Sequence, residues 1–458
     1  MDCTRNHSRI WVEWSIVARI VLCLLIPAES WAAFATQFSL TTGEEYNDNI
    51  FFSKSREHDF ITFFVPTLTL LYAPEGQVAP TLTANISPSY QLFARNSDLN
   101  NFDNVSANAG YTYQYSPRLN FNFSDSFQRL GSTRTSGLGG FGGLGGFGQF
   151  QTGPTSPPPV GGVATPSLSQ NLNDLTQGTQ TSNFVSLQGS YLYRPDISFG
   201  GGVTNGFTSF SGSAGGTDVF TSITARGIYN WRQEHNLHAG YTISINNSRN
   251  GDNGVIHSFD LGDDYFTNYN IQLTPTLSLA ASTGLSLNTG DSGPRVANNT
   301  SITITKLWET AQLNGGLRKG LTPSLGVSGI SDTTSLFTNF NWRLTEKLST
   351  YSSANLSFFD TEDVNFKTFQ AGLGFQYLFT TWLSSALSYN FNWIDSGAGA
   401  NSTDLLQKGV VKSNSVFLSI TTRFDIWPNT GLARSISSPT LSPILTTPFP
   451  IRVPQPSP

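Results

Sequence analysis

Residues that could perform chemistry are scarce in this sequence. It has five histidines, four of which follow the N-terminal leader, at His58, His235, His238 and His257. None lies at a recognisable spacing from a serine, so no nucleophile with its general base is predicted. His235 and His238 are three residues apart outside any helical pattern, and we favour ordinary loop histidines over a metal pair. An acid–base pair assembled across strands would have His58 and Asp59 as its candidates. We expect no enzyme and no cofactor.

Charge is scarce as well. Charged residues make up 12% of the chain, about half the share of roughly 25% in soluble domains, while aromatic residues reach 13%. A soluble protein with so few charges would tend to precipitate, and a disordered one would lack the aromatic residues. The net charge is −5, and no basic stretch suits nucleic acid. The composition therefore predicts a fold with a large neutral surface that does not face water.

The N-terminus has the composition of an export signal. Arg5 and Arg9 precede the apolar run IVLCLLIPA, and small residues follow as far as Ala35. A basic region, a short apolar region and a cleavage site near residues 32–35 predict a signal peptide over residues 1–35. Both cysteines, Cys3 and Cys23, lie in this leader, so the mature chain has no thiol for a disulfide or a metal site.

The mature chain is dominated by alternation of period two. In residues 77–95 the even positions are mostly apolar, and the odd positions are mostly Thr, Asn, Ser and Gln. Such alternation predicts a strand with one apolar and one polar face. Pro88 is unexpected there, because proline removes a ladder hydrogen bond, and it suggests a bulge or weak pairing. The pattern recurs in residues 104–129, 219–231, 259–273, 277–287, 369–379, 383–393 and 416–424. No helical period persists after the leader, so the chain is predicted to be all-β.

The connections between these strands alternate in length. Short ones are expected at residues 73–76, 116–118, 194–196, 232–236, 274–276 and 345–347. Longer polar ones lie between them, at residues 47–58, 95–101, 130–180, 246–257, 288–299, 320–333 and 396–411. Short turns at one end and long loops at the other are typical of an up-and-down antiparallel barrel in an outer membrane. We predict such a barrel over residues 36–426, with about 16–18 strands and a turn at Trp308–Thr310 that keeps the number even.

The residue types assign the two faces of this barrel. The polar face carries Thr, Asn, Ser, Gln and Gly in place of the Lys and Glu that bulk water would favour. An apolar side facing lipid around a hydrated lumen fits better, because closure satisfies every backbone group in the hydrocarbon layer. Asp125 is the exception on the apolar face of its strand. Aromatic pairs that precede four short turns would form an interfacial girdle, namely Tyr113 and Tyr115, Tyr191 and Tyr193, Tyr229 and Trp231, and Tyr377 and Phe379.

Few charges point into the predicted lumen. By strand parity they are Arg226, Asp260, Asp264, Arg343 and Arg423. A ring of opposed charges can set ion preference in a pore, whereas internal salt bridges would only brace the lumen, and both alternatives stay open. Four aromatic residues on the polar face would line a sugar path, plug it or simply pack there: Phe93, Phe210, Phe266 and Phe337.

One segment resembles a known family. GEEYNDNIF at residues 43–51, with DFITFFVPTLTL behind it, is similar to the start of a family of β-barrel porins of Gram-negative bacteria. Some members of that family are associated with exopolysaccharide and protein-sorting systems. The resemblance covers residues 43–72 and implies an outer-membrane barrel, and it brings no catalytic or binding residues.

The carboxylates of the same segment could gather around a cation. Glu44, Glu45 and Asp48, with Asp59 nearby, offer oxygen ligands of the kind that Ca²⁺ prefers. The alternative is a loop rich in Asn and Asp whose side chains bond to their own backbone. We favour the loop, because no glycine-spaced calcium motif follows.

The longest loop, residues 130–180, contains the duplicated sequence GLGGFGGLGGFG at residues 137–148. No Lys-Ser/Thr follows it, so it is not a phosphate-binding loop. We favour a disordered surface loop expanded by duplication. The alternative is a flap that plugs the lumen through Leu138, Phe141, Leu144 and Phe147. The chain ends in a Pro-rich segment, residues 427–458, which is predicted to be a disordered periplasmic tail.

These features together predict a porin-like passive channel for small hydrophilic solutes in the outer membrane of a Gram-negative bacterium. Its partners would be outer-membrane lipid, the barrel-assembly machinery and small solutes or polysaccharide, with no nucleic acid. The alternative is a barrel that serves exopolysaccharide export or cell-surface structure.

Overall fold

The computed structural model describes residues 34–51, 54–72, 81–131, 179–211, 216–232, 235–247, 253–267, 277–290, 293–323, 330–360, 365–396 and 409–427. The predicted plug at residues 137–148 lies outside them, as do nearly all of the predicted leader and tail. Among the described residues, no helix is long and apolar enough to cross a membrane.

Eighteen strands make up almost all of the described chain. They are β1 (Phe34–Asn47), β2 (Asp59–Tyr72), β3 (Thr81–Phe93), β4 (Asn101–Ser116), β5 (Leu119–Leu130), β6 (Gln180–Arg194), β7 (Ile197–Phe210), β8 (Gly216–Arg232), β9 (His235–Asn247), β10 (Gly254–Thr267), β11 (Leu277–Gly290), β12 (Gly293–Leu307), β13 (Ala311–Pro323), β14 (Ile330–Arg343), β15 (Leu348–Asp360), β16 (Asn365–Leu378), β17 (Leu383–Ser396) and β18 (Gly409–Trp427). A single turn of 3₁₀ helix, η2 (Ser97–Leu99), lies between β3 and β4.

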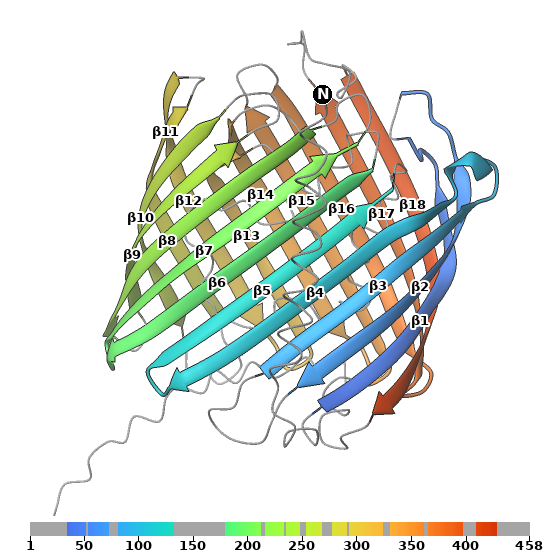
Figure 1. Ribbon diagram of the computed structural model, residues 1–458, viewed down its shortest axis with the longest axis horizontal. Coiled ribbons are helices and arrows are strands. Elements are labelled where there is room, and N and C mark those ends of the chain that lie inside the picture. The colour runs from blue at the N-terminus through green and yellow to red at the C-terminus, as the bar shows by residue number, and fades with distance from the viewer. Residues whose placement is uncertain are drawn as a thin grey trace, which may run out of the picture.

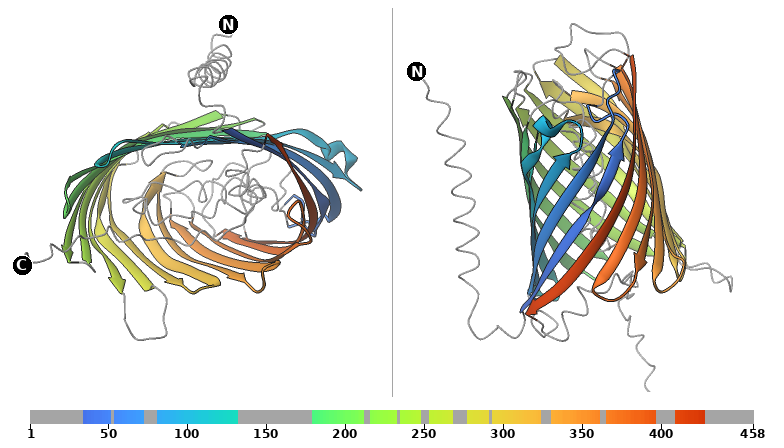
Figure 2. Two further views of the ribbon diagram at one scale, coloured as in Figure 1. Left: turned by 90° about the horizontal axis from the view of Figure 1, so that it is seen from below. Right: turned by 90° about the vertical axis from the view of Figure 1, so that its right-hand side faces the viewer.

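The strands form one antiparallel sheet that closes on itself. Each strand pairs with its neighbours in the sequence, and β1 pairs with both β2 and β18, which completes the ring. The tilted strands form a barrel (Figure 1), and the first and last strands lie side by side in both views of Figure 2. The predicted up-and-down barrel is therefore confirmed, with eighteen strands.

The alternation of the sequence places apolar side chains on the outside of this ring. On β18, Val416, Leu418 and Ile420 are exposed on the outer face, while Ser415, Phe417 and Ser419 of the other parity are buried. On β9 the same pattern exposes Leu237 and Tyr241 and buries the polar residues of the other parity. A strand alternates strictly between faces, so the outer faces are apolar and the inner faces are mainly polar, except on β2, which buries Ile61, Phe63 and Val65 on its inner side.

Connection lengths alternate less regularly than predicted. Two-residue turns at 117–118 and 195–196 agree with the prediction, as does the turn at Trp308–Thr310, which the bond from Trp308 N to Ala311 O closes at 2.8 Å. The long loop predicted at residues 288–299 is wrong, because β11 and β12 are separated only by residues 291–292. The residues at these strand ends are polar, yet their backbone N–H and C=O groups still pair with the neighbouring strand. Backbone pairing cannot be read from the polarity of a side chain, and for that reason the sequence suggested a loop.

The residue opposite Pro88 explains why a proline is tolerated within this strand. In the register of β2 with β3, Phe64 pairs with Tyr90 and Leu68 pairs with Ile86, and the ladder skips the residues between these pairs. Extending that register places Pro88 opposite Pro66, so two residues without an N–H face each other. The inner-face hydroxyls of Thr67 and Ser87 bond across the gap at 2.8 Å.

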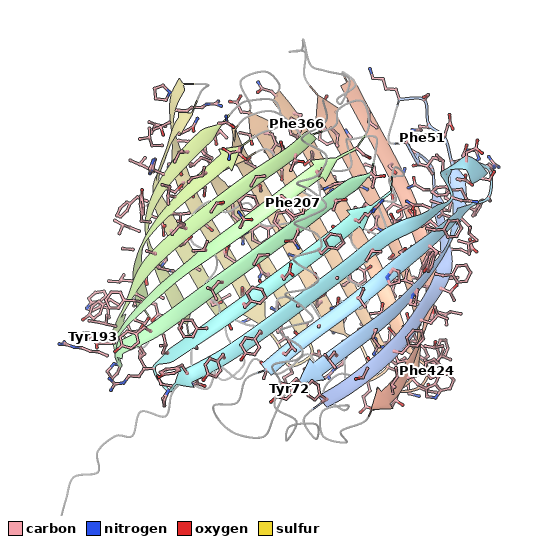
Figure 3. The ribbon with its side chains drawn as sticks, in the orientation of Figure 1. Phe51, Tyr72, Tyr193, Phe207, Phe366 and Phe424 are labelled. Atoms are coloured by element: carbon pink, nitrogen blue, oxygen red, sulfur yellow. The ribbon has the colours of Figure 1, made fainter. Side chains whose placement is uncertain are left out.

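The aromatic pairs lie at the end of the barrel with the short turns. Tyr115, Tyr193 and Trp231 are each about half exposed or more, and all lie on the outer face just before a turn. Figure 3 shows Tyr193 and Phe424 on the outer rim at this end, on opposite sides of the barrel. Aromatic side chains gathered at one height are typical of a membrane–water interface.

Candidate functional site

The inner wall of the barrel is the surface on which function must be sought. It carries Ser, Thr, Asn, Gln and Gly on strand after strand, with charges at a few positions. Neighbouring strands link these side chains by hydrogen bonds, for example Ser258 Oγ to Ser286 Oγ at 2.8 Å and Asn108 Nδ2 to Asn85 Oδ1 at 3.1 Å. The wall is therefore polar and held in place by its own network.

Two of the predicted pore charges lie close together. Arg226 on β8 and Asp260 on β10 both pair with Gly240, which lies between them on β9. Because Gly240 has no side chain, the two charged side chains can lean toward each other across it. They are 6% and 1% exposed, so both are taken almost completely out of water.

His238 joins this pair, which the sequence did not reveal. Its Nε2 lies 3.7 Å from Asp260 Oδ2, and the side chain is 6% exposed. The ring lies over Gly262 of β10, where a β-carbon would come within 2.5 Å of it. We call Arg226, His238 and Asp260 the lumen charge cluster. Its opposed charges are placed either to brace the inner wall or to set a local field for ions, the two alternatives that the sequence left open.

The other predicted charges do not belong to this cluster. Arg343 occupies an inward position at the end of β14, beside the turn to β15. Arg423 is on β18, where its backbone N–H donates to Trp382 O at 2.8 Å. Asp264 has its backbone in β10, and its side chain lies outside the described residues. Of the four predicted charges whose side chains the structure describes, Arg226 and Asp260 share one row of the wall, whereas Arg343 and Arg423 lie on β14 and β18.

Arg318 is an inward charge that the sequence analysis missed. It lies on β13, and its guanidinium is 4.9 Å from the centre of the Phe337 ring on β14. The Phe337 ring covers Gly316, where a β-carbon would lie 3.0 Å from Phe337 Cζ. The pairing of Gly316 with Phe337 identifies the inner face of β13. That pairing is known only from the tertiary structure.

The other three aromatic residues predicted on the polar face have different places. Phe93 is buried in a cluster with Ile50 and Ile61 at the start of the first loop. The side chains of Phe210 and Phe266 lie outside the described residues. Phe337 alone is placed along the wall of the lumen, so a continuous aromatic path is not established by these four residues.

The segment that resembles the porin family closes the barrel. Asp48 Oδ1 accepts from Asn414 N at 2.6 Å, and Asp48 Oδ2 accepts from Asn414 Nδ2 at 2.7 Å. Ser413 Oγ donates to Asn47 Oδ1 at 3.1 Å, and Asn49 Nδ2 donates to Lys412 O at 2.8 Å. These residues bind the first loop to the start of β18.

Aromatic stacking continues this closure deeper in the wall. Phe63 of β2 and Phe417 of β18 stack over Gly43 of β1, with ring centroids 4.3 Å apart and planes 12° apart. A β-carbon at position 43 would lie 2.6 Å from the Phe63 ring and 2.1 Å from Leu418 O. We call the contacts of β18, β1 and β2 the seam.

The carboxylates considered for the alternative of a cation site have separate places at the seam. Glu44 points outward and accepts from Thr62 Oγ1 at 2.8 Å, whereas Glu45 points inward and is fully buried beside Asn47. Asp48 is engaged by Asn414 and lies 3.6 Å from Arg56. Adjacent residues of a strand face opposite sides, so Glu44 and Glu45 cannot share one ion. In the described chain, no group of three or more His, Cys, Asp or Glu is placed to hold a metal.

His58 and Asp59, the candidates for an acid–base pair, each have other partners. Asp59 is fully buried, and its oxygens accept from the backbone N–H groups of Phe60, Arg95 and Asn96 at 2.8, 3.0 and 2.9 Å. His58 contacts Arg95 Nη1 instead. A carboxylate committed to several backbone donors anchors the loop after β3 and is a poor general base.

His235 and His238 point to opposite sides of the wall. His235 Nδ1 lies 2.6 Å from Asp263 Oδ2 on the outer face, close to the ring of Trp231. His238 faces inward to the lumen charge cluster. Three positions apart in a strand is an odd separation, so the two rings cannot bind the same metal.

Among known proteins, similar ones were found only in the comparison with solved structures. No protein-family model and no curated protein matches the chain. The chain is similar to OccAB3 of Acinetobacter baumannii, with 10% identity and a TM-score of 0.44 over 86% of this chain and 100% of that one. It is similar to OccK2 (OpdF) of Pseudomonas aeruginosa in complex with glucuronate, with 10% identity and a TM-score of 0.43 over 86% and 98% of the two chains. It is also similar to OpdK of Pseudomonas aeruginosa with vanillate, with 11% identity and a TM-score of 0.43 over 86% and 99%.

Proposed function

We propose that this protein is a porin-like channel that lets small hydrophilic solutes cross the outer membrane of a Gram-negative bacterium. The observation that carries the proposal is the closed ring of eighteen strands with apolar side chains outside and polar side chains inside. Such a ring satisfies its backbone hydrogen bonds in a hydrocarbon layer and presents a wall that water wets. The surrounding lipid and the barrel-assembly machinery would be its partners.

The wall favours neutral polar solutes over strongly charged ones. Hydroxyl and amide groups predominate along it, and the lumen charge cluster contains both signs. A field of mixed sign gives a modest ion preference, unlike a ring of one sign. We therefore propose weak charge selectivity and no catalysis.

Single-channel recording in a planar bilayer tests this function. The full-length protein should produce steady conductance steps. A second recording uses the chain that lacks residues 137–148 and tests the predicted plug. Silence before the deletion and conductance after it would support a plugged channel. Silence in both would contradict a channel and leave a structural barrel.

A second candidate function is the passage of a glycan. The Phe337 ring contacts Gly316 on the inner wall, and the Arg318 guanidinium lies over the ring at 4.9 Å from its centre, so an aromatic ring and a hydrogen-bond donor for a sugar are together here. Adding a soluble oligosaccharide to the conducting channel tests it. Concentration-dependent block that Phe337→Ala abolishes would favour glycan passage, and unaltered current would favour general diffusion.

A further inference from the structure

The inner wall from β13 to β17 carries side-chain amides in two adjacent ladder rows. The first row places Asn355 of β15, Gln370 of β16 and Asn392 of β17 side by side. The second row lies two residues nearer the short turns and begins with Asn314 of β13 beside Asn339 of β14. We call these amides the lumen amide band, which comprises Asn314, Asn339, Asn355, Gln370, Asn390 and Asn392.

The band faces the lumen and is more accessible than the wall around it. On β15 and β16 its residues have the parity of Ser357 and Thr368, which are buried on the inner face nearer the long loops. Gln376 and Ser388, on the same face nearer the short turns, are buried as well. Asn339 is exposed, and the other amides of the band are half-buried. The band is therefore a part of the inner wall that a solute in the lumen can reach.

The amides of the band do not bond to one another. Within the described chain, the side chains of Gln370, Asn390 and Asn392 make no hydrogen bond. Asn355 accepts from Ser357 Oγ at 3.4 Å, which is long for a hydrogen bond. Each side-chain amide offers two N–H donors and a carbonyl acceptor. Several such groups in register therefore present both donors and acceptors to a ligand.

Two aromatic rings lie at the edges of the band. Phe337 pairs with Asn355 in the first row, and the Arg318 guanidinium is 4.9 Å from the centre of its ring. Tyr351 lies beyond the second row on the side of the short turns, over Gly374, where a β-carbon would be 2.2 Å from the Tyr351 ring. Aromatic rings beside a few convergent polar groups are typical of sites for small molecules.

We propose that the lumen amide band binds a neutral linear oligosaccharide. The described residues of its two rows carry no charge from β13 to β17, so they favour an uncharged ligand. A sugar presents hydroxyl groups that donate and accept, and C–H groups that pack on aromatic rings, which matches the amides and the two rings. Neighbouring strands are about 4.8 Å apart, so the band extends roughly 19 Å, further than one sugar ring reaches. Such a site deepens the proposed channel function and rests on it for the entry of the solute.

Equilibrium dialysis of the full-length protein tests the site. The probes are radiolabelled maltohexaose, isomaltohexaose and laminarihexaose, in a detergent whose headgroup is not a sugar, and hexaglycine is the control ligand. We expect saturable binding of at least one hexasaccharide and no binding of hexaglycine. An absence of binding for every hexasaccharide, or equal binding of hexaglycine, would overturn the proposal.

A pair of double variants locates the binding on the wall. Gln370→Met with Asn392→Leu removes two paired amides of the band, and we expect binding to weaken roughly tenfold or more, because hydrogen bonds to the ligand are lost. Asn122→Leu with Gln188→Met makes the same change at a pair on β5 and β6, where this inner-face row and the inner-face rows beside it hold no aromatic residue from β4 to β7. The control should bind as the wild type does. Equal losses in the two double variants would contradict the assignment.

Labelling of a single cysteine gives a readout that leaves the rest of the band intact. The background carries Cys3→Ser and Cys23→Ser. Asn339→Cys, at the exposed amide, should react more slowly with a methanethiosulfonate reagent when the hexasaccharide is present. Asn122→Cys, on the inner face of β5, should react at an unchanged rate. Protection of neither cysteine, or of both equally, would refute the site.

Conductance of the same preparations is recorded in a planar bilayer, which separates this site from the proposed channel. A protein that conducts but binds no hexasaccharide refutes the band as a binding site and leaves the channel intact. A protein that binds a hexasaccharide but does not conduct refutes the channel function itself.

Discussion

The seam and the lumen charge cluster are both parts of the inner wall, yet they bury polar groups in opposite ways. At the seam, Asn47, Asp48 and Asn49 each make hydrogen bonds, and the Phe63–Phe417 stack excludes water beside them. In the cluster, Asp260 has His238 at 3.7 Å, and within the described chain its carboxylate oxygens accept no direct hydrogen bond. Satisfied networks give rigidity, whereas a buried carboxylate without such bonds is costly. The comparison teaches that the seam holds the barrel closed, and we expect the cluster to bear on the ion preference of the proposed channel.

The largest effect is expected from filling the seam. Gly43→Ala places a methyl group within 2.1 Å of Leu418 O and 2.6 Å of the Phe63 ring, so β1 cannot pair normally with both neighbours. We expect destabilisation of about 3 kcal/mol or more. Heat-modifiable migration on a gel measures the folded fraction.

Gly200→Ala is the matched control for that change. Gly200 is an inner-face glycine of β7 with its nearest contact at 3.8 Å, which is ordinary van der Waals distance. Its substitution should leave the folded fraction unchanged. Equal loss in the two variants would show that the seam has no special role.

The next effect concerns the polar half of the seam. Asp48→Ala removes both bonds with Asn414 and leaves that residue's donors without the carboxylate. We expect a loss of about 1–3 kcal/mol in the free energy of unfolding. Urea titration of the barrel in detergent provides the measurement. Asp98→Ala, at an exposed acidic residue of η2, should cost almost nothing.

The lumen charge cluster should alter selectivity more than stability. Arg226→Gln removes the positive charge beside Asp260, and we expect the permeability ratio to shift a few-fold toward cations. Asp260→Asn should shift it toward anions. The reversal potential in a salt gradient measures both shifts, and Thr242→Ser on the same wall serves as the control. Identical reversal potentials in all variants would make the cluster a brace and nothing more.

The smallest effect tests whether the inner and outer sides of the seam differ. Glu44→Gln alters an outward carboxylate whose only described hydrogen bond is to Thr62 at 2.8 Å. We expect a change within about 0.5 kcal/mol, as for most surface substitutions. The same urea titration detects it. A loss in the free energy of unfolding as large as that of Asp48→Ala would show that Glu44 belongs to the contacts of the seam that close the barrel. Its outward position predicts the opposite.

Much of the fold was predictable because a strand alternates strictly between its two faces. The period of two identified the strands, the apolar outer face and the turn at Trp308–Thr310. The boundaries of the strands were harder to predict, since the ends of β11 and β12 are polar and pair through their backbones. Pro88 was unexplained until the register placed it opposite Pro66.

The candidate site was less predictable than the fold. Parity placed Arg226 and Asp260 inside, but their approach across Gly240 and the arrival of His238 depend on the register of three strands. The acidic segment at residues 43–51 suggested a cation site, and its role in closing the barrel requires β18, which is more than 350 residues away. Parity assigns a side chain to a face and cannot say which neighbour it meets.

The sequence by itself therefore determined an all-β chain with an apolar face, a polar face and an even number of strands, because these follow from local alternation and turn chemistry. Only the tertiary structure decided which residues meet. Closing the ring joins the first strand to the last, and the stagger of each pair sets which side chains lie at the same place on the wall. That is why the seam and the lumen charge cluster both arise from strand pairing, although every residue in them can be read from the chain.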